Sequence, residues 1–210
     1  REALGSIYHD LMGLEQQAGN LDTALQHGWK AVNTYETPES KTRGMAGLAG
    51  ALTEAGDLQA AEDAYTVVVH TTSDPYYLVY AHDALAHIAA RRGDVEAFSQ
   101  WASRCDALDW ASGPRNVQAE VLYYRGLSYE ELGMMTDARS WLERASAFAT
   151  EYGFNRISFQ AEEALARLEA ERALELERDV EVATTPASAA PPAVRDGLRA
   201  MRADLVGAGA

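Results

Sequence analysis

The chain has 210 residues, 47% of them apolar, and its 32 acidic and 18 basic side chains give a net charge of −14. An acidic field repels phosphate backbones and anionic lipids, so this composition argues against binding to nucleic acid or to a membrane surface. No apolar run approaches the roughly 18 residues that suggest a membrane span, and the single cysteine excludes an internal disulfide framework. We therefore expect a cytoplasmic protein. Because the chain starts at Arg1 rather than Met, a missing N-terminal domain stays open.

Helical periodicity divides the sequence into consecutive segments. Apolar residues recur at i, i+3, i+4 and i+7, as at Met45, Leu48, Ala49 and Leu52. No stretch shows the sustained alternation of a half-buried strand. In chain order, the predicted helices cover residues 2–18, 21–36, 41–55, 58–71, 76–92, 95–110, 115–132, 136–152 and 155–179.

A glycine followed by a helix-capping residue recurs between these segments. The copies are Gly19-Asn20, Gly56-Asp57 and Gly93-Asp94, each 37 residues after the one before. Glycine tolerates the left-handed conformation that ends a helix, and Asn or Asp caps the next helix through its side-chain oxygen. Gly133 follows 40 residues later, where Thr136 or Asp137 is expected to cap instead. The marker predicts tight reversals between antiparallel helices.

Prolines mark the other ends of these helical pairs. Pro38, Pro75 and Pro114 are 37 and 39 residues apart, and each stands where a second helix should end and a new one begin. Proline suits the first turn of a helix and is poor inside one. The two markers together predict a repeat of one helical hairpin every 37–40 residues.

The paired helices resemble tetratricopeptide repeats. In the best copy, Gly126 and Tyr129 match the small and aromatic residues of the first helix, and Ala138, Leu142 and Ala145 match the small–large–small pattern of the second. The other copies carry Leu11, Met12, Ala24 and Ala31; Leu48, Ala49, Leu52, Ala61, Tyr65 and Val68; and Leu85, Ala86, Phe98, Ala102 and Cys105. The resemblance implies an all-α, right-handed superhelical solenoid of four hairpins over about residues 2–152, with the helix 155–179 as a continuation or cap.

Three residues depart from the family pattern. Met12 is large where a small residue is usual, Phe98 replaces an alanine, and Gly28 replaces a bulky residue. Tryptophans stand nearby in three of the second helices and are expected to refill the lost volume; they are Trp29, Trp101 and Trp141.

The resemblance also implies a binding groove, because the first helix of each pair lines the concave surface in this family. The residues expected there are Arg43, Tyr80, Asp83, His87, Arg91, Glu120, Tyr123, Leu127, Glu130, Gln160, Glu163 and Arg167. Aromatic and Arg side chains with mixed charge suit recognition of a peptide, although an ordinary polar surface is the alternative. The Lys/Asn/Arg set that grips a C-terminal carboxylate in some members is absent, since His9, Ala46, Asp83 and Tyr123 stand at the matching places.

The sequence offers few residues for catalysis or metal binding. Asp83 and His87 share a helix face at i, i+4, but no third ligand accompanies them. Cys105 occupies a small-residue position of the repeat and is expected to be a buried structural thiol. The adjacent Glu162 and Glu163 point about 100° apart on a helix and are interpreted as a solvated face. With no phosphate-binding loop or nucleophile motif, we expect no enzyme, no metal and no cofactor.

The C-terminal part reads as a linker and a short helix. Residues 183–192 are rich in Ala, Thr and Pro, which is typical of a linker after a repeat domain at 1–182. Within 193–210, Val194, Leu198, Met201 and Leu205 form one apolar stripe. Such a short helix needs a surface to cover, so we hypothesise docking on the repeats of its own or a neighbouring chain, as in a homo-oligomer, with a frayed tail as the alternative.

The function expected from these observations is a scaffold that binds another protein or a peptide. Two alternatives stay open. One is a regulatory module that senses a peptide or small ligand within a larger bacterial transcriptional regulator or signalling ATPase. The other is an oligomeric structural component in which the repeats stack from chain to chain.

Overall fold

The computed structural model describes residues 1–184, and it describes the side chains of residues 1–174. Within this range every regular element is a helix. The elements are α1 (Glu2–Gln17), α2 (Leu21–Thr34), α3 (Pro38–Glu54), α4 (Leu58–Thr71), α5 (Pro75–Arg91), α6 (Val95–Asp106), the short 3₁₀ helix η1 (Trp110–Ser112), α7 (Arg115–Glu131), α8 (Met135–Tyr152) and α9 (Asn155–Thr184). The predicted helix at 193–210 and most of the predicted linker lie outside the described residues; positions 183 and 184 still belong to α9.

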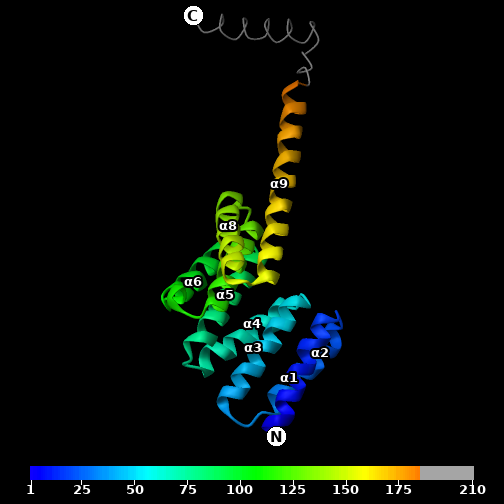
Figure 1. Cartoon of the computed structure of the whole chain (residues 1–210), viewed down its shortest axis with the longest axis vertical. Helices are drawn as coiled ribbons and strands as arrows, with labels where there is room; N and C mark the ends of the chain where they lie inside the picture. Colours follow the sequence, from blue (N-terminus) through cyan, green and yellow to red (C-terminus); the bar gives the residue numbers. More distant parts are fainter. Residues whose placement is uncertain (185–210) are drawn as a thin grey trace, which may run out of the picture. The chain divides into compact units, whose positions relative to one another are not determined.

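The helices pair in chain order, as the sequence predicts. Helix α1 packs on α2, α3 on α4, α5 on α6, and α7 on α8. Successive hairpins also meet, through α2 and α3, then α4 and α5, then α5 and α7. Figure 1 shows these hairpins following one another along the chain. The described residues therefore form a helical-repeat array of the predicted kind.

Glycine ends the first helix of each hairpin. Gly19, Gly56, Gly93 and Gly133 have φ between 71° and 82°, the left-handed region that any residue with a Cβ enters at a cost. The predicted reversals are thus confirmed at all four positions.

The capping residues agree only in part with the prediction. Asp57 and Asp94 accept hydrogen bonds from the N–H groups of Ala60 and Ala97, as expected. Asn20 does not cap α2, because its side-chain amide instead donates to Glu15 at 2.8 Å. The expected cap at position 136 or 137 is also wrong: α8 already begins at Met135, and its N-terminus has no side-chain cap.

Three predicted boundaries are wrong by several residues. Helix α3 starts at Pro38 rather than 41, since Thr37 accepts a hydrogen bond from the N–H of Ser40 and proline fits the first turn. Helix α6 ends at Asp106 rather than 110, and Asp109 then takes a left-handed conformation with φ 49° before η1. Helix α9 continues to Thr184, past the expected end at 179.

Small residues allow the helices to approach closely. Ala49, Ala61 and Ala81 are fully buried in one cluster with Leu85 and Ile88, which joins α3, α4 and α5. Gly126 lies so near Leu142 that an added Cβ would stand 2.7 Å from the leucine Cγ. Such contacts are the physical basis of the small–large–small pattern in the sequence.

The departures in the first hairpin compensate one another. The space that a Cβ on Gly28 would need is filled by the Met12 sulfur and by Leu48, at 2.6 and 3.0 Å. The large residue on α1 and the small one on α2 are therefore a matched exchange. The expectation that Trp29 refills this volume is wrong, because its side chain is exposed.

The chain divides into two compact units, Arg1–Leu168 and Glu169–Ala210. The first contains all four hairpins and the start of α9. Within it, Ala161, Ala164 and Leu168 of α9 pack with buried residues of α7 and α8, including Leu122 and Leu142. Among the described helices, none is long and apolar enough to cross a membrane.

Candidate functional site

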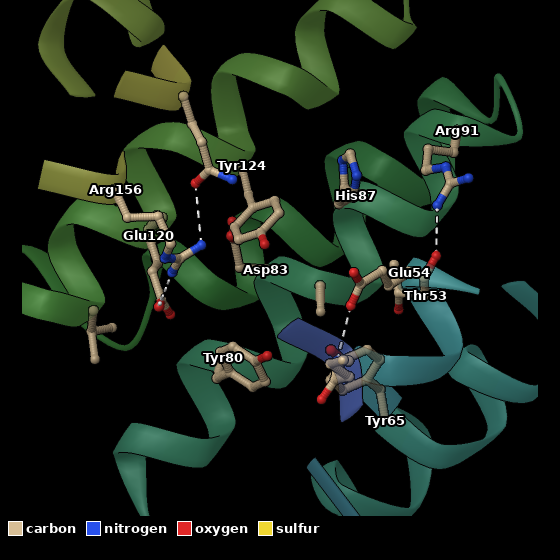
Figure 2. A pocket seen from close by; sticks show the side chains of 16 residues that line it. Thr53, Glu54, Tyr65, Tyr80, Asp83, His87, Arg91, Glu120, Tyr124 and Arg156 are labelled. Atoms are coloured by element: carbon tan, nitrogen blue, oxygen red, sulfur yellow. Dashed lines mark hydrogen bonds and ion pairs between the residues drawn. The ribbon is translucent and has the colours of Figure 1, made fainter. Parts of the chain in front are cut away.

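A cavity of about 490 Å³ lies among the first helices of the hairpins in the Arg1–Leu168 unit. Figure 2 shows the side chains that line it. They are Gln16 of α1; Gly50, Thr53 and Glu54 of α3; Tyr65 of α4; Tyr80, Asp83, Ala84, His87 and Arg91 of α5; Val117, Glu120, Val121 and Tyr124 of α7; and Arg156 and Gln160 of α9. Every lining residue except Tyr65 therefore comes from a first helix or from α9. We call this space the central cavity.

The wall of the central cavity combines buried and exposed side chains. Tyr65, Asp83 and His87 are buried. Arg91 and Arg156 are exposed, so the cavity is not sealed from solvent. A concave space that combines aromatic side chains with a few placed polar groups is the usual form of a ligand site.

His87 has a defined hydrogen-bonding role in this wall. Its Nδ1 lies 3.2 Å from the Ser128 hydroxyl, which itself donates to the carbonyl of Tyr124 at 2.7 Å. Since the hydroxyl has one proton, it accepts from His87, and Nδ1 carries the ring proton. Burial, with a smaller effect of Arg91, lowers the pKa of His87 to about 4. The imidazole is therefore neutral, and its Nε2 carries a free lone pair.

Asp83 belongs to a buried charge cluster shared by α5, α6 and α7. The Arg125 guanidinium lies 3.4 Å from Oδ1 of Asp83 and 3.3 Å from Oδ1 of Asp106. Burial raises the pKa of Asp83 to about 7, although Arg125 opposes that rise. The Arg125 guanidinium also lies 5.5 Å from the centre of the Trp141 ring. One buried cation thus serves two carboxylates, of which only Asp83 lines the central cavity.

Three tyrosines supply the aromatic part of the wall. The rings of Tyr65 and Tyr80 meet edge to face with their centres 5.9 Å apart. Both hydroxyls lie beside Gly50, where an added Cβ would be 3.3 Å from the Tyr80 hydroxyl. The Tyr124 ring lies 5.6 Å from that of His87. Burial raises the pKa of all three phenols, so each stays a neutral hydroxyl that can donate or accept.

The charged groups at the exposed side are already paired. Arg91 donates to the carbonyl of Thr53 at 3.1 Å. Arg156 donates to Gln160 at 3.1 Å and lies 3.7 Å from Glu120. Gln16 donates to Glu54 at 3.0 Å, which links α1 to α3. Figure 2 marks these contacts with dashed lines.

The structure brings half of the predicted groove residues together. Those that line the central cavity are Tyr80, Asp83, His87, Arg91, Glu120 and Gln160. Those that do not line it are Arg43, Tyr123, Leu127, Glu130, Glu163 and Arg167. Arg43 instead donates to the Tyr35 hydroxyl at 2.9 Å, and Glu163 is exposed.

The difference on α7 has a packing cause. Tyr123 and Leu127 pack in a cluster with Ala164 and Leu168 of α9. Arg167 of α9 pairs with Glu130 of α7 at 2.9 Å. Helix α9 therefore covers this edge of α7, and the face that remains open carries Val117, Val121 and Tyr124 instead.

The most consequential residue that the sequence did not identify is Arg125. It stands 40 residues after Leu85, at the equivalent place in the next hairpin, and is 2% exposed. A charged residue at an otherwise apolar repeat position was the available signal. Tyr65 was identified as a repeat residue, but its hydroxyl reaches the cavity from a second helix.

The environment of Cys105 is that of a structural thiol. Cys105 is fully buried, its Sγ donates to the carbonyl of Val79 at 3.7 Å, and burial raises the pKa of its thiol to about 12. The prediction of a structural thiol at this position is confirmed. Among the described residues, no three His, Cys, Asp or Glu side chains converge as ligands for one metal ion.

Comparison with known proteins supports the fold. No family model matches the sequence, and no curated protein matches it. Among solved structures, the chain is similar to a kinesin light chain of Podospora anserina described as having nearly identical TPR-like repeats. That match covers 89% of this chain and 99% of that one at 17% identity, with a TM-score of 0.55. The chain therefore has the tetratricopeptide-like helical-repeat fold, with its central cavity among the first helices of the hairpins.

Proposed function

We propose that the chain binds a segment of another polypeptide through the central cavity and the adjoining surface of its first helices. The observation that carries this proposal is the origin of the lining residues, which come from α1, α3, α5, α7 and α9 and from only one second helix. Because these five helices follow one another along the array, a ligand can contact the chain at many points. A polypeptide segment, which presents side chains at regular intervals, matches such a surface.

The composition of the wall also supports recognition of a peptide. Tyr and Arg are enriched at protein interfaces, because they combine a large contact area with directional hydrogen bonds. The central cavity presents Tyr65, Tyr80 and Tyr124 together with Arg91 and Arg156. These groups could surround one anchoring side chain while the rest of the segment lies on the first helices.

The cavity volume favours a second candidate function. A volume of about 490 Å³ falls within the range of about 300–1,000 Å³ that is typical of small-molecule sites. A sensing module within a larger regulator would use the same space for a small ligand. In that case a small-molecule library would stabilise the protein against heating, and peptides would compete with the bound compound.

The experiment selects a displayed library of random 12-residue peptides on the purified chain and measures the affinities of the selected peptides by calorimetry. Ala84→Leu adds bulk to the cavity wall and Tyr80→Ala removes an aromatic contact, so each should weaken binding about tenfold or more. Trp29→Ala is the matched control, because this exposed aromatic lies on α2 and does not line the cavity. Selected peptides that bind all variants equally, or no peptides at all, would rule the proposal out.

A further inference from the structure

Two acceptor atoms on buried side chains of the central cavity receive no hydrogen bond from a described residue. Nε2 of His87 is an acceptor, because the ring proton is on Nδ1, and no described residue donates to it. Asp83 receives its hydrogen bond from Arg125 on Oδ1, and no described residue donates to Oδ2. Both side chains are more than nine-tenths buried and line the cavity. Such acceptors lose free energy if a ligand displaces water without replacing its hydrogen bonds.

The two acceptors lie on one face of α5. Residues four apart on a helix are neighbours on its surface, and Figure 2 shows Asp83 and His87 lining the same space. A ligand with several N–H donors on one cationic group could reach both. A ligand with acceptor atoms in this place would be repelled by the lone pairs of Asp83 and His87.

The charge balance of the wall favours the same class of ligand. Above the Asp83 pKa of about 7, the three carboxylates of Asp83, Glu54 and Glu120 line the cavity against two cations, Arg91 and Arg156. Arg91 already donates to a backbone carbonyl, and Arg156 already lies against Glu120 and Gln160. Behind the wall, Arg125 is shared between Asp83 and Asp106, so that cluster has one carboxylate in excess.

The aromatic groups complete a site for a cation. Tyr65, Tyr80 and Tyr124 line the same space with aromatic side chains that can contact a cation, and their neutral hydroxyls can accept hydrogen bonds. An aliphatic stem of a Lys or Arg side chain could pack on these rings while its charged end reaches the buried acceptors. The whole chain adds a favourable long-range field with its net charge of −14.

We propose that the central cavity holds the Lys or Arg side chain of the bound peptide, with Asp83 and His87 accepting hydrogen bonds from its cationic end. This inference rests on the proposed peptide-binding function and narrows it to a segment with a basic anchor residue. We expect the cation to come from a side chain rather than from the N-terminus of the peptide. The cavity is lined by first helices before α5 and by helices after it, so the bound segment can continue in both directions from its anchor residue.

The experiment uses synthetic, N-acetylated versions of the selected 12-residue peptides and the full chain. Each Lys or Arg is replaced in turn by norleucine, which keeps the apolar stem and removes the charge. One replacement should weaken binding about tenfold to a hundredfold, the range expected for hydrogen bonds to a charged group. The same peptides with a free N-terminus show whether the terminal ammonium contributes.

A pair of variants assigns the effect to the cavity. At pH 8, above the Asp83 pKa of about 7, Asp83→Asn keeps the shape and the acceptor toward Arg125 but removes the charge in the cavity. Asp106→Asn removes a charge from the same guanidinium outside the cavity, and so serves as the matched control. The norleucine penalty should shrink several-fold in Asp83→Asn and stay unchanged in Asp106→Asn.

The possible results separate the two proposals. If peptides are selected and bind, but no basic residue matters or the penalty is the same in Asp83→Asn, the cationic-anchor inference is wrong and peptide binding stands. The inference is also wrong if the affinity of the peptides depends on a free N-terminal amine and not on any Lys or Arg side chain. If no peptide binds, both proposals fall together.

Discussion

Two neighbouring interfaces between hairpins bury equivalent positions with different chemistry. The positions facing the preceding hairpin are Ala81, Leu85 and Ile88 on α5, and Val121, Arg125 and Ser128 on α7, each 40 residues later. All six are nearly inaccessible to solvent. The first set packs in an apolar cluster with α3 and α4, whereas Arg125 and Ser128 contact Asp83 and His87.

The difference in chemistry suggests that the two interfaces have different roles, one in stability and one in the geometry of the site. An apolar interface gains free energy from burial in proportion to its area. A buried ion pair roughly breaks even, because desolvation of both charges offsets their attraction. The second interface instead fixes Asp83 and His87 at the central cavity. We infer that the first interface mainly stabilises the array and that the second mainly orients the side chains of the candidate site.

The largest effect is expected when Arg125 is changed to Ala. The change leaves Asp83 buried without its cation, so the free energy of unfolding should fall by about 3–5 kcal/mol. Urea denaturation followed by circular dichroism measures this. The double variant Arg125→Met with Asp83→Leu should recover most of the loss. A double variant as unstable as the single one would show that the cluster stabilises the fold in its own right.

Leu85→Ala tests the apolar interface at the equivalent position. It removes a side chain that is 1% exposed, and large-to-small changes of this kind lower the free energy of unfolding by about 2–5 kcal/mol. Unlike the change at Arg125, this loss should be the same at pH 5 and pH 8, since no titratable group is altered. A strong pH dependence of the Leu85→Ala loss would contradict the division between the interfaces.

The pH dependence of Asp83→Asn examines the charge cluster directly. The native carboxyl, which faces Arg125, Asp106, Glu120 and Cys105, has a pKa of about 7 against an ordinary 3.8. The native state therefore binds the proton more tightly than the unfolded state, and this group makes the wild type less stable as pH rises from about 4 to 7.

Asparagine lacks this proton, so the stability of Asp83→Asn relative to wild type should rise across that pH range and level off above it. His87, with its pKa lowered to about 4, contributes the opposite slope between pH 4 and 6.5 in both proteins and cancels in the difference. Denaturation at half-unit steps of pH measures the effect. A flat difference would mean that Arg125 balances the effect of burial on the Asp83 pKa, and a difference that falls with pH would mean that Arg125 outweighs it.

The smallest effect is expected for Asp106→Asn. Its carboxylate contacts the same guanidinium as Asp83, but its side chain is 53% exposed and water replaces the lost contact. The free energy of unfolding should change by about 1 kcal/mol or less. Urea denaturation of the two Asn variants at the same pH provides the check; equal changes in the free energy of unfolding would show that burial does not distinguish the two carboxylates.

Much of the fold could be predicted because its determinants are local. Gly56 and Gly93 end helices by backbone conformation, Asp57 and Asp94 cap the next ones, and these signals act within a few residues. The candidate site was predicted in part, because helical periodicity places Tyr80, Asp83, His87 and Arg91 on one face of α5. Position on a face does not say which neighbour covers it.

Only the tertiary structure decided which helix packs over which surface. The sequence by itself determined the paired helices, their glycine reversals and the small residues that let them approach, since these follow from backbone conformation and side-chain size. Only the packed structure showed that α9 covers the Tyr123 edge of α7, and that Arg125 lies between two carboxylates from other helices. Both depend on contacts between residues far apart in the chain, and no local pattern records such contacts.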